Sequence, residues 1–253
     1  MVSPRTPDGP PPAPPVQRVR VRYARRGRMR FTSTRDFARA LERALRRAGV
    51  PMAYSAGFHP HPRISYAGGA PTGMASEAEY LELALARRCD PEELRQALDA
   101  ALPTGLDVLA VVEAQGRSLT DLLEVSEWEI AFPGLAASVV RAAVDGLRAR
   151  PSAEVTRMFK TGEKTFDVLP ALCRADVGEG AGCAILHLVV RHTTPAVRPD
   201  DVLSALRQAT GFEAAGSPRV TRLAQGPWVA AAAQVADPLA ADTNAAAAAG
   251  DAP

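Results

Sequence analysis

The sequence has few cysteines and no long hydrophobic run, and each lack excludes a class of protein. Its three cysteines, Cys89, Cys173 and Cys183, stand far apart with no CxxC spacing. Structural zinc ions and iron–sulfur clusters need closely spaced thiolates, so we expect buried free thiols. No stretch approaches the roughly 18 apolar residues of a membrane-spanning helix. The N-terminal segment also lacks the apolar core of a signal peptide, so we predict a soluble, cytoplasmic protein with no membrane contact.

The signatures of common enzyme classes are also missing. The chain has no Walker loop, dinucleotide-binding glycine pattern, nucleophile elbow or metalloprotease helix. An enzyme would have to use Asp36, His59 or His61 as its acid and base. His59 and His61 can share a metal ion, but no third ligand is evident nearby. We therefore predict no metal and no cofactor, and these absences do not favour an enzyme.

Lysine is missing from the segment in which positive charge is densest. Residues 18–50 hold 12 arginines and no lysine, opposed only by Asp36 and Glu42, which is a local charge of +10. The whole chain carries +2 and residues 1–17 cancel, so residues 51–253 carry −8. Such segregation is typical of a protein that binds a polyanion, most plausibly RNA. A solvated basic face without a partner is the alternative.

Low-complexity composition marks both ends of the chain. Residues 1–16 are rich in proline, and residues 230–253 are rich in alanine. Neither segment carries a pattern that would bury an apolar face and offset the entropy of ordering the chain. We therefore expect disordered tails on both sides of a folded region.

Between the tails, one order of predicted elements occurs twice. Residues 17–115 show a strand with alternating apolar residues, a helix, two strands, a helix opened by residues 90–93, and a last strand. Residues 124–225 repeat the order β-α-β-β-α-β. Each split unit of this kind forms an antiparallel sheet with two helices on one face. The sequence therefore predicts an α+β fold of two tandem ferredoxin-like units, whose other sheet faces are open to a ligand.

Arginines gather on one face of a predicted strand and one face of a predicted helix. Along the first strand they alternate with apolar residues, so burial of the apolar face displays a row of guanidinium groups. In the helix expected between an N-cap at Thr34 and Gly49, arginines at i, i+4, i+8 and i+11 form one stripe. Planar guanidinium groups match phosphate oxygens. The arginines that we expect to bind RNA are Arg18, Arg20, Arg22, Arg28, Arg30, Arg35, Arg39, Arg43 and Arg46.

The loop at residues 53–63 is too rich in functional side chains to be a simple connection. Gly57 allows a tight backbone, and Pro60 and Pro62 stiffen the chain around the two histidines. Aromatic rings stack on unpaired bases. A packed aromatic loop with hydrogen-bonded histidines is the alternative. The loop residues that we add to the RNA-binding set are Tyr54, Ser55, Phe58, His59, His61 and Arg63.

Four segments together resemble a known family. Residues 30–36, 46–51, 54–62 and 76–80 read RFTSTRD, RRAGVP, YSAGFHPHP and SEAEY. They are similar to the signature of the radical-SAM-linked domain of unknown function 2344, and the likeness extends to about Leu223. In that family the domain is fused behind a cobalamin-type radical SAM module or encoded beside one, often near a ribonuclease of the E/G type. The resemblance implies a stand-alone accessory protein that presents tRNA or rRNA to a separately encoded radical SAM enzyme.

One residue departs from that family pattern. The family usually has a histidine where this chain has Thr34. If that histidine is catalytic, its loss favours a binding role here. Two alternatives stay open: an enzyme with an acid/base or metal site at Asp36, His59 and His61, and a scaffold whose basic face meets an acidic protein.

Overall fold

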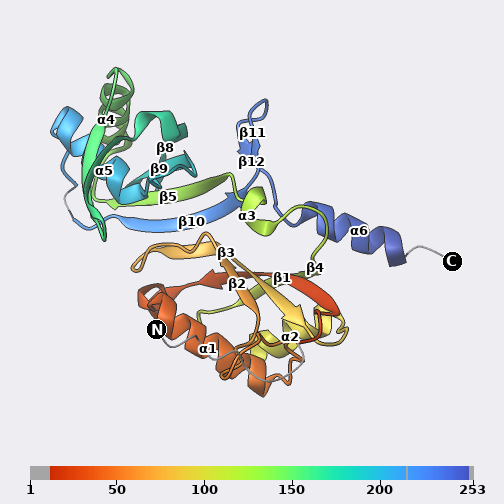
Figure 1. Ribbon diagram of the computed structural model, residues 1–253. Helices are drawn as coiled ribbons and strands as arrows, with labels where there is room; N and C mark the ends of the chain where they lie inside the picture. The colour runs from red at the N-terminus through yellow and green to blue at the C-terminus, as the bar shows by residue number, and fades with distance from the viewer. Residues whose placement is uncertain (1–11, 215, 251–253) are drawn as a thin grey trace, which may run out of the picture. The chain divides into compact units, whose positions relative to one another are not determined.

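The computed structural model describes residues 12–214 and 216–250, and it has a mixed α+β fold with antiparallel strand pairing. The chain divides into two compact units (Figure 1). Unit 1 combines Met1–Asp121 with Pro238–Pro253, and unit 2 is Leu122–Asp237. Residues 1–11 of the expected N-terminal tail lie outside the described residues. None of the helices in the described ranges is long and apolar enough to cross a membrane.

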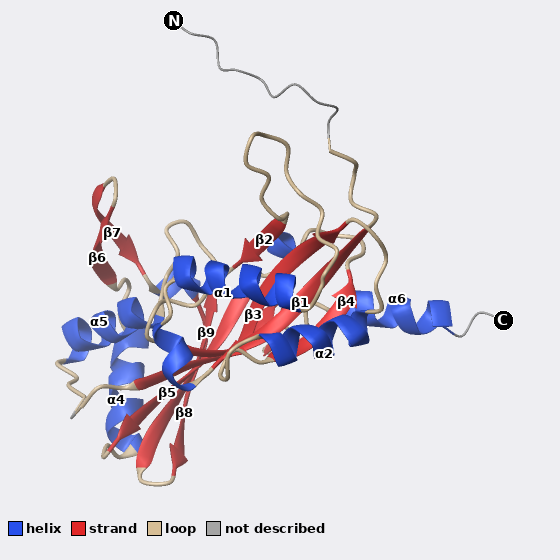
Figure 2. Cartoon of the chain, turned by 90° about the horizontal axis from the view of Figure 1, so that it is seen from below, coloured by secondary structure: helices blue, strands red, loops and turns tan. Residues whose placement is uncertain are grey.

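Unit 1 contains a four-stranded antiparallel sheet in the order β4-β1-β3-β2. Helices α1 and α2 lie across one face of this sheet (Figure 2). The elements of unit 1 up to the boundary are β1 (Gln17–Arg25), η1 (Gly27–Phe31), α1 (Thr34–Arg47), β2 (Ile64–Ala67), β3 (Ala75–Leu85), α2 (Pro91–Ala101), β4 (Val108–Glu113) and α3 (Leu119–Leu122).

The alternation of apolar residues along β1 and β3 produces the core of unit 1. Val19 and Val21 of β1 pair with Leu83 and Leu81 of β3, and all four side chains are buried. Because side chains alternate across a strand, the arginines of β1 are on the opposite face from these residues. Burying each such aliphatic side chain contributes about 1.5–3 kcal/mol, which fixes the register of the two strands.

Helix α1 is positioned by its N-cap and by one aromatic contact. Ser33 is the N-cap, and its Oγ accepts a hydrogen bond from the backbone N–H of Asp36 at 3.2 Å, so our assignment of the cap to Thr34 was one residue late. Past the end of the helix, Gly49 adopts a φ of 63°, as the sequence predicts. Phe37 stacks on Tyr23 of β1, with ring centroids 4.7 Å apart, and this contact holds α1 against the sheet.

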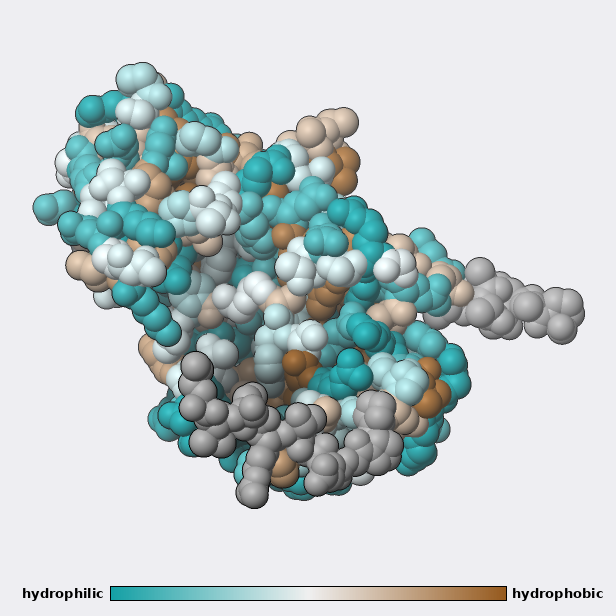
Figure 3. All heavy atoms as spheres, in the orientation of Figure 1, coloured by the Kyte–Doolittle hydropathy of each residue, from teal (hydrophilic) through white to brown (hydrophobic). Residues whose placement is uncertain are grey.

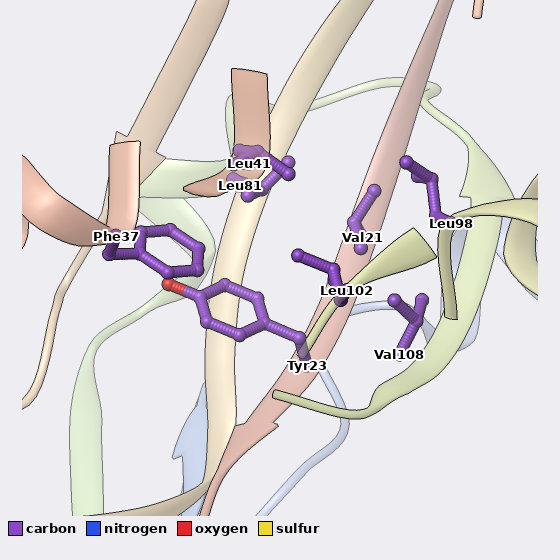
Figure 4. A pocket seen from close by; sticks show the side chains of 8 residues that line it. All are labelled: Val21, Tyr23, Phe37, Leu41, Leu81, Leu98, Leu102 and Val108. Carbon is purple, nitrogen blue, oxygen red and sulfur yellow. The ribbon is translucent and has the colours of Figure 1, made fainter. Parts of the chain in front are cut away.

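The stacked pair borders a small cavity in the core (Figure 4). The cavity measures about 10 Å³. Its wall is entirely apolar, and a space of this size and character stays dry rather than holding a polar ligand. The lining side chains come from the sheet, from α1 and from the α2 segment: Val21, Tyr23, Phe37, Leu41, Leu81, Leu98, Leu102 and Val108.

Unit 2 contains a second antiparallel sheet, in the order β10-β5-β9-β8. A separate hairpin, β6–β7, turns at Gly162, which has a φ of 107°. The elements of unit 2 are β5 (Val125–Pro133), α4 (Ala137–Arg148), β6 (Glu154–Phe159), β7 (Gly162–Asp167), η2 (Leu169–Ala171), β8 (Leu172–Gly180), β9 (Cys183–Arg191), α5 (Pro199–Thr210), β10 (Arg219–Gly226), β11 (Trp228–Val229) and β12 (Gln234–Val235).

The C-terminal segment differs from the disorder that we expected for residues 230–253. It forms β12 and then α6 (Ala240–Gly250), and the start of α6 is anchored on unit 1. Leu239 is buried, and the Asp242 carboxylate is buried against Arg20, which donates to it at 2.7 Å. The backbone N–H of Gln115 donates to the same carboxylate at 2.9 Å. The alanine-rich composition did not predict this anchor, because only two residues of the segment, Leu239 and Asp242, form it.

Replacing Asp242 by asparagine tests this anchor. The substitution removes the nearer of the two carboxylates paired with the buried Arg20 cation, the other being Glu82 at 3.5 Å, and breaking a buried pair costs up to about 3–5 kcal/mol. We expect a clear drop in the midpoint of thermal unfolding. Asp145→Asn is the matched control, because Asp145 is an exposed residue of α4. Equal midpoints for the two variants would show that the Arg20–Asp242 pair does not stabilise the protein.

Two hydrogen bonds of His192 tie together two segments of unit 2. The backbone carbonyl of Leu123 can only accept, so His192 Nδ1 donates to it at 2.7 Å, and His192 Nε2 accepts from the Ser126 hydroxyl at 2.7 Å. Part of His192 is exposed, but both ring nitrogens are engaged inside the protein. Burial lowers the pKa of His192, and the nearby Arg222 cation lowers it further.

The lowered pKa makes the stability of unit 2 depend on pH. An unfolded histidine titrates near pH 6.5, so below that pH the unfolded chain binds a proton that the folded protein resists. The free energy of unfolding should therefore fall as the pH is lowered from neutral through about 6.5. Urea unfolding of the wild type and of His192→Gln, at neutral pH and at about pH 6.5, checks this. His61→Gln is the control, because it removes an exposed histidine. An unchanged pH dependence in His192→Gln contradicts it.

Candidate nucleic-acid interface

The arginines of β1 do not form the open row that we predicted. Arg20 is 2% exposed because Asp242 and the backbone carbonyl of Arg117 cover its guanidinium group. Arg18 pairs with Glu82 at 3.1 Å, and the Nε of Arg22 donates to the backbone carbonyl of Glu77 at 3.0 Å. Partners inside unit 1 therefore engage these three cations and bury Arg20, whereas the Arg18 side chain stays 55% exposed, so the three do not form one open row.

Two more arginines, at the end of β1, stabilise the fold. Arg25 is buried and donates to the backbone carbonyls of Ala70, Arg30 and Thr32 at 3.0–3.2 Å. Arg26 donates from Nε to the Glu77 carboxylate at 2.8 Å and pairs with Asp107 at 2.7 Å. Hydrogen bonding to Glu77 raises the pKa of Arg26. These groups fix the turn that leads into η1, where Arg25 is buried and the Arg26 side chain is 47% exposed.

Helix α1 keeps its arginines in solvent, as predicted. Because Phe37, Leu41 and Leu45 face the core, the opposite side of the helix is exposed. Within the described residues, the guanidinium groups of Arg35, Arg43 and Arg46 make no hydrogen bond or ion pair. Arg39 has only Asp36, at 4.0 Å, and both side chains are more than 60% exposed, so the pair is worth little.

The arginine stripe ends in a surface depression at the C-terminal end of α1. Arg43, Arg46 and Arg47 line it together. Arg47 also donates to the backbone carbonyl of Ala101 at 2.6 Å, which orients its guanidinium group. Three cations around one hollow form a site that attracts an anionic group such as phosphate.

The segment before α1 adds a further cationic and aromatic group. Arg28 is exposed, and Arg30 lies over the ring of Phe31, with its Cζ 4.7 Å from the ring centroid. Phe31 itself is 59% exposed. A guanidinium group stacked on an exposed ring presents a flat apolar surface and a charge at the same point.

The loop before β2 has a closed base and exposed side chains at its tip. Tyr54 and Pro62 form a backbone bridge, and the backbone N–H of Ser55 donates to the carbonyl of His61 at 2.9 Å. The Ser55 hydroxyl accepts a hydrogen bond from the backbone N–H of His61 at 3.1 Å. At the tip, Phe58 is 65% exposed and Gly57 has a φ of 126°, which favours glycine. Arg63 at the base of the loop is also exposed.

Two exposed aromatic residues near α1 were missing from the predicted set. Phe31 precedes the helix, and Tyr66 lies on β2. The Tyr66 and Phe37 rings make an edge-to-face contact, with their centroids 6.1 Å apart. Burial of its phenol group, with a contribution from Glu42 of α1, raises the pKa of Tyr66 to about 12. β2 therefore lies beside α1. Phe31 lies within the RFTSTRD motif, but no pattern in the sequence marked either ring as exposed.

The candidate acid and base residues form no recognisable catalytic group. Asp36 is exposed at the start of α1, where its carboxylate accepts from the Ser33 hydroxyl at 2.7 Å. His59 and His61 are exposed in the loop. In the described part of the chain, no three His, Cys, Asp or Glu side chains are grouped so that they could hold a metal ion. Cys89, Cys173 and Cys183 are half-buried free thiols, so the full burial that we expected is incomplete.

Comparison with known proteins yields one family. The family model described as "Uncharacterized protein conserved in bacteria (DUF2344)" matches residues 18–199. No curated protein matches the chain. A crystal structure of the first two RRM domains of a yeast poly(U) binding protein is 13% identical and covers 81% of this chain and 98% of its own. Its TM-score is 0.20, so this likeness supports no conclusion about fold or function.

Proposed function

Because this chain belongs to the DUF2344 family of proteins conserved in bacteria, we propose that it is a member whose role is to bind RNA as an accessory protein. The proposed contact surface consists of the exposed arginines of α1, the η1 segment before it, and the loop at residues 54–63. We call this surface the α1 face. The β1 arginines are not part of it, because they are engaged inside unit 1.

The observation that supports this proposal most is the difference between the arginines of β1 and those of α1. Where the fold needs a cation, this chain supplies a carboxylate or a carbonyl within hydrogen-bond distance, as it does for Arg20 and Arg26. The described residues supply no such partner to Arg35, Arg43 and Arg46. Exposed like charges along one helix repel one another. An external polyanion would remove that repulsion and match the guanidinium forks.

We further propose that each unit is ferredoxin-like, with folded domains at residues 17–115 and 124–225. The strand orders β4-β1-β3-β2 and β10-β5-β9-β8 support this proposal, since both place the first and third strands of the unit at the centre. In each unit the helices follow the first and third of these strands. This is the order of a split β-α-β fold.

The proposed partner is a separately encoded radical SAM enzyme. The family resemblance of the N-terminal motifs supports this partner. The chain holds only three cysteines, spaced too far apart in sequence for a cluster-binding motif, so radical chemistry would take place on a second protein. In this role the protein would hold tRNA or rRNA while the partner modifies it. Pull-down of the partner with and without nuclease would separate direct binding from RNA bridging.

Charge reversal on the α1 face tests RNA binding directly. We expect Arg39→Glu/Arg43→Glu to weaken binding to tRNA and rRNA fragments by roughly 10- to 100-fold near 0.1 M salt, because two phosphate contacts become repulsive. The negative slope of log K against log salt should also become shallower by about 1 to 2. Fluorescence anisotropy at two or more salt concentrations measures both quantities.

The matched control reverses two exposed arginines on the helices of unit 2. Arg148→Glu/Arg207→Glu makes the same change in net charge on α4 and α5. If this control weakens binding as much as the α1 variant, the attraction is a property of net charge and the α1 face is not the site. If the α1 variant binds as the wild type does, the proposal is wrong.

A further inference from the structure

We infer that the α1 face selects RNA whose bases are unpaired, and that the ring of Phe58 is a stacking platform for one of them. This inference rests on the proposed function and names the substrate class of that same site. It follows from where the exposed aromatic rings lie in the chain, how the loop holds Phe58, and the presence of exposed cations on the same face.

Exposed aromatic side chains are concentrated in the part of the sequence that contains α1. Among the described residues, the large hydrophobic side chains that are exposed include four aromatic ones, and all four lie between residues 31 and 66: Phe31, Tyr54, Phe58 and Tyr66. The exposed large hydrophobic side chains of unit 2 are aliphatic: Val139, Met158 and Val229. On the face seen in Figure 3, hydrophobic residues form small separate spots among hydrophilic ones. Single exposed rings among cations are typical of a surface that stacks bases.

Phe58 is presented by a loop whose base is closed. The backbone bonds between Ser55 and His61, together with the Ser55 hydroxyl, join the two arms of the loop. The base continues into the sheet, where the backbone N–H of Ala53 donates to the carbonyl of Ala84 at 2.8 Å. A ring held outward by such a loop loses little conformational freedom on binding. Exposure of 65% of the apolar Phe58 ring to water is unfavourable in free energy, and a stacked base would offset that free energy.

The ring and the cations together distinguish unpaired from paired RNA. In a duplex every base is stacked inside the helix, so a protruding ring meets only the backbone and the groove edges. A single strand can turn its bases toward the rings while its phosphates follow the cations. The α1 face offers both surfaces, in Phe58 and the stripe that contains Arg43. A purely electrostatic site would need the stripe alone.

The experiment compares two RNAs on the full-length protein. A labelled single strand of mixed sequence and the blunt duplex of that strand with its complement are titrated by fluorescence anisotropy. We expect the wild type to prefer the single strand. Phe58→Ala should weaken single-strand binding roughly 5- to 150-fold and leave duplex binding unchanged, as for the loss of one stacked base. Phe58→Leu, which keeps an apolar side chain without the flat ring, should lose most of the same affinity.

Controls separate this inference from the proposed function. Met158→Ala removes a 70% exposed side chain from unit 2 and should change neither affinity. Equal affinity of the wild type for both RNAs, or a Phe58→Ala variant that binds the single strand normally, would overturn the inference. If Arg39→Glu/Arg43→Glu still weakens both complexes in that case, RNA binding by the α1 face stands. If the wild type binds neither RNA, both proposals fail.

Discussion

The stacking of Phe37 on Tyr23 fixes the position of α1, and the candidate site depends on that position. The two rings are 4.7 Å apart and nearly parallel, with an angle of 7° between their planes. Once Phe37 faces the sheet, helical periodicity turns Arg35, Arg39 and Arg43 to the solvent side. The basic stripe is therefore a consequence of how the core is packed. Its cations need no separate support to stay exposed.

Arginine serves two purposes in unit 1. On β1 and in the turn after it, guanidinium groups join strands, loops and the C-terminal segment, because one group can donate to several acceptors at once. Arg25 shows this most clearly, with three backbone carbonyls around it. On α1 the same residue type is exposed and the described residues give Arg43 and Arg46 no acceptor. Counting arginines therefore overstates the surface that a ligand can reach.

Local sequence patterns predicted the helices and strands well, but they predicted the partners and exposure of individual arginines poorly. The start of α2 follows from Asp90 and Pro91, since Asp90 accepts hydrogen bonds from two backbone N–H groups of the first turn. Likewise the alternation on β1 placed Arg20 correctly on the face away from the core. Its partner, Asp242, is 222 residues away, and no local pattern links the two. Periodicity gives the direction of a side chain, whereas its partners depend on tertiary structure.

For the candidate site, the sequence predicted the residues that depend on local structure. The exposure of the α1 stripe and of Phe58 follows from helix periodicity and from the loop composition. The loss of Arg20 from the surface and the exposure of Phe31 and Tyr66 do not follow, because they depend on what packs above each residue. The comparison shows which part of a basic segment can be assigned from sequence: the part on a helix whose opposite side is core.

The return of the C-terminal segment to unit 1 has a consequence for synthesis of the protein. Arg20 leaves the ribosome 222 residues before Asp242, the nearer of its two carboxylate partners. At roughly 5–20 residues per second, translation separates the two by roughly 10 to 45 s. Throughout that interval Arg20 has only its partners within the N-terminal part of unit 1, among them Glu82 at 3.5 Å. The contact with Asp242 therefore forms only after the whole of unit 2 has been made.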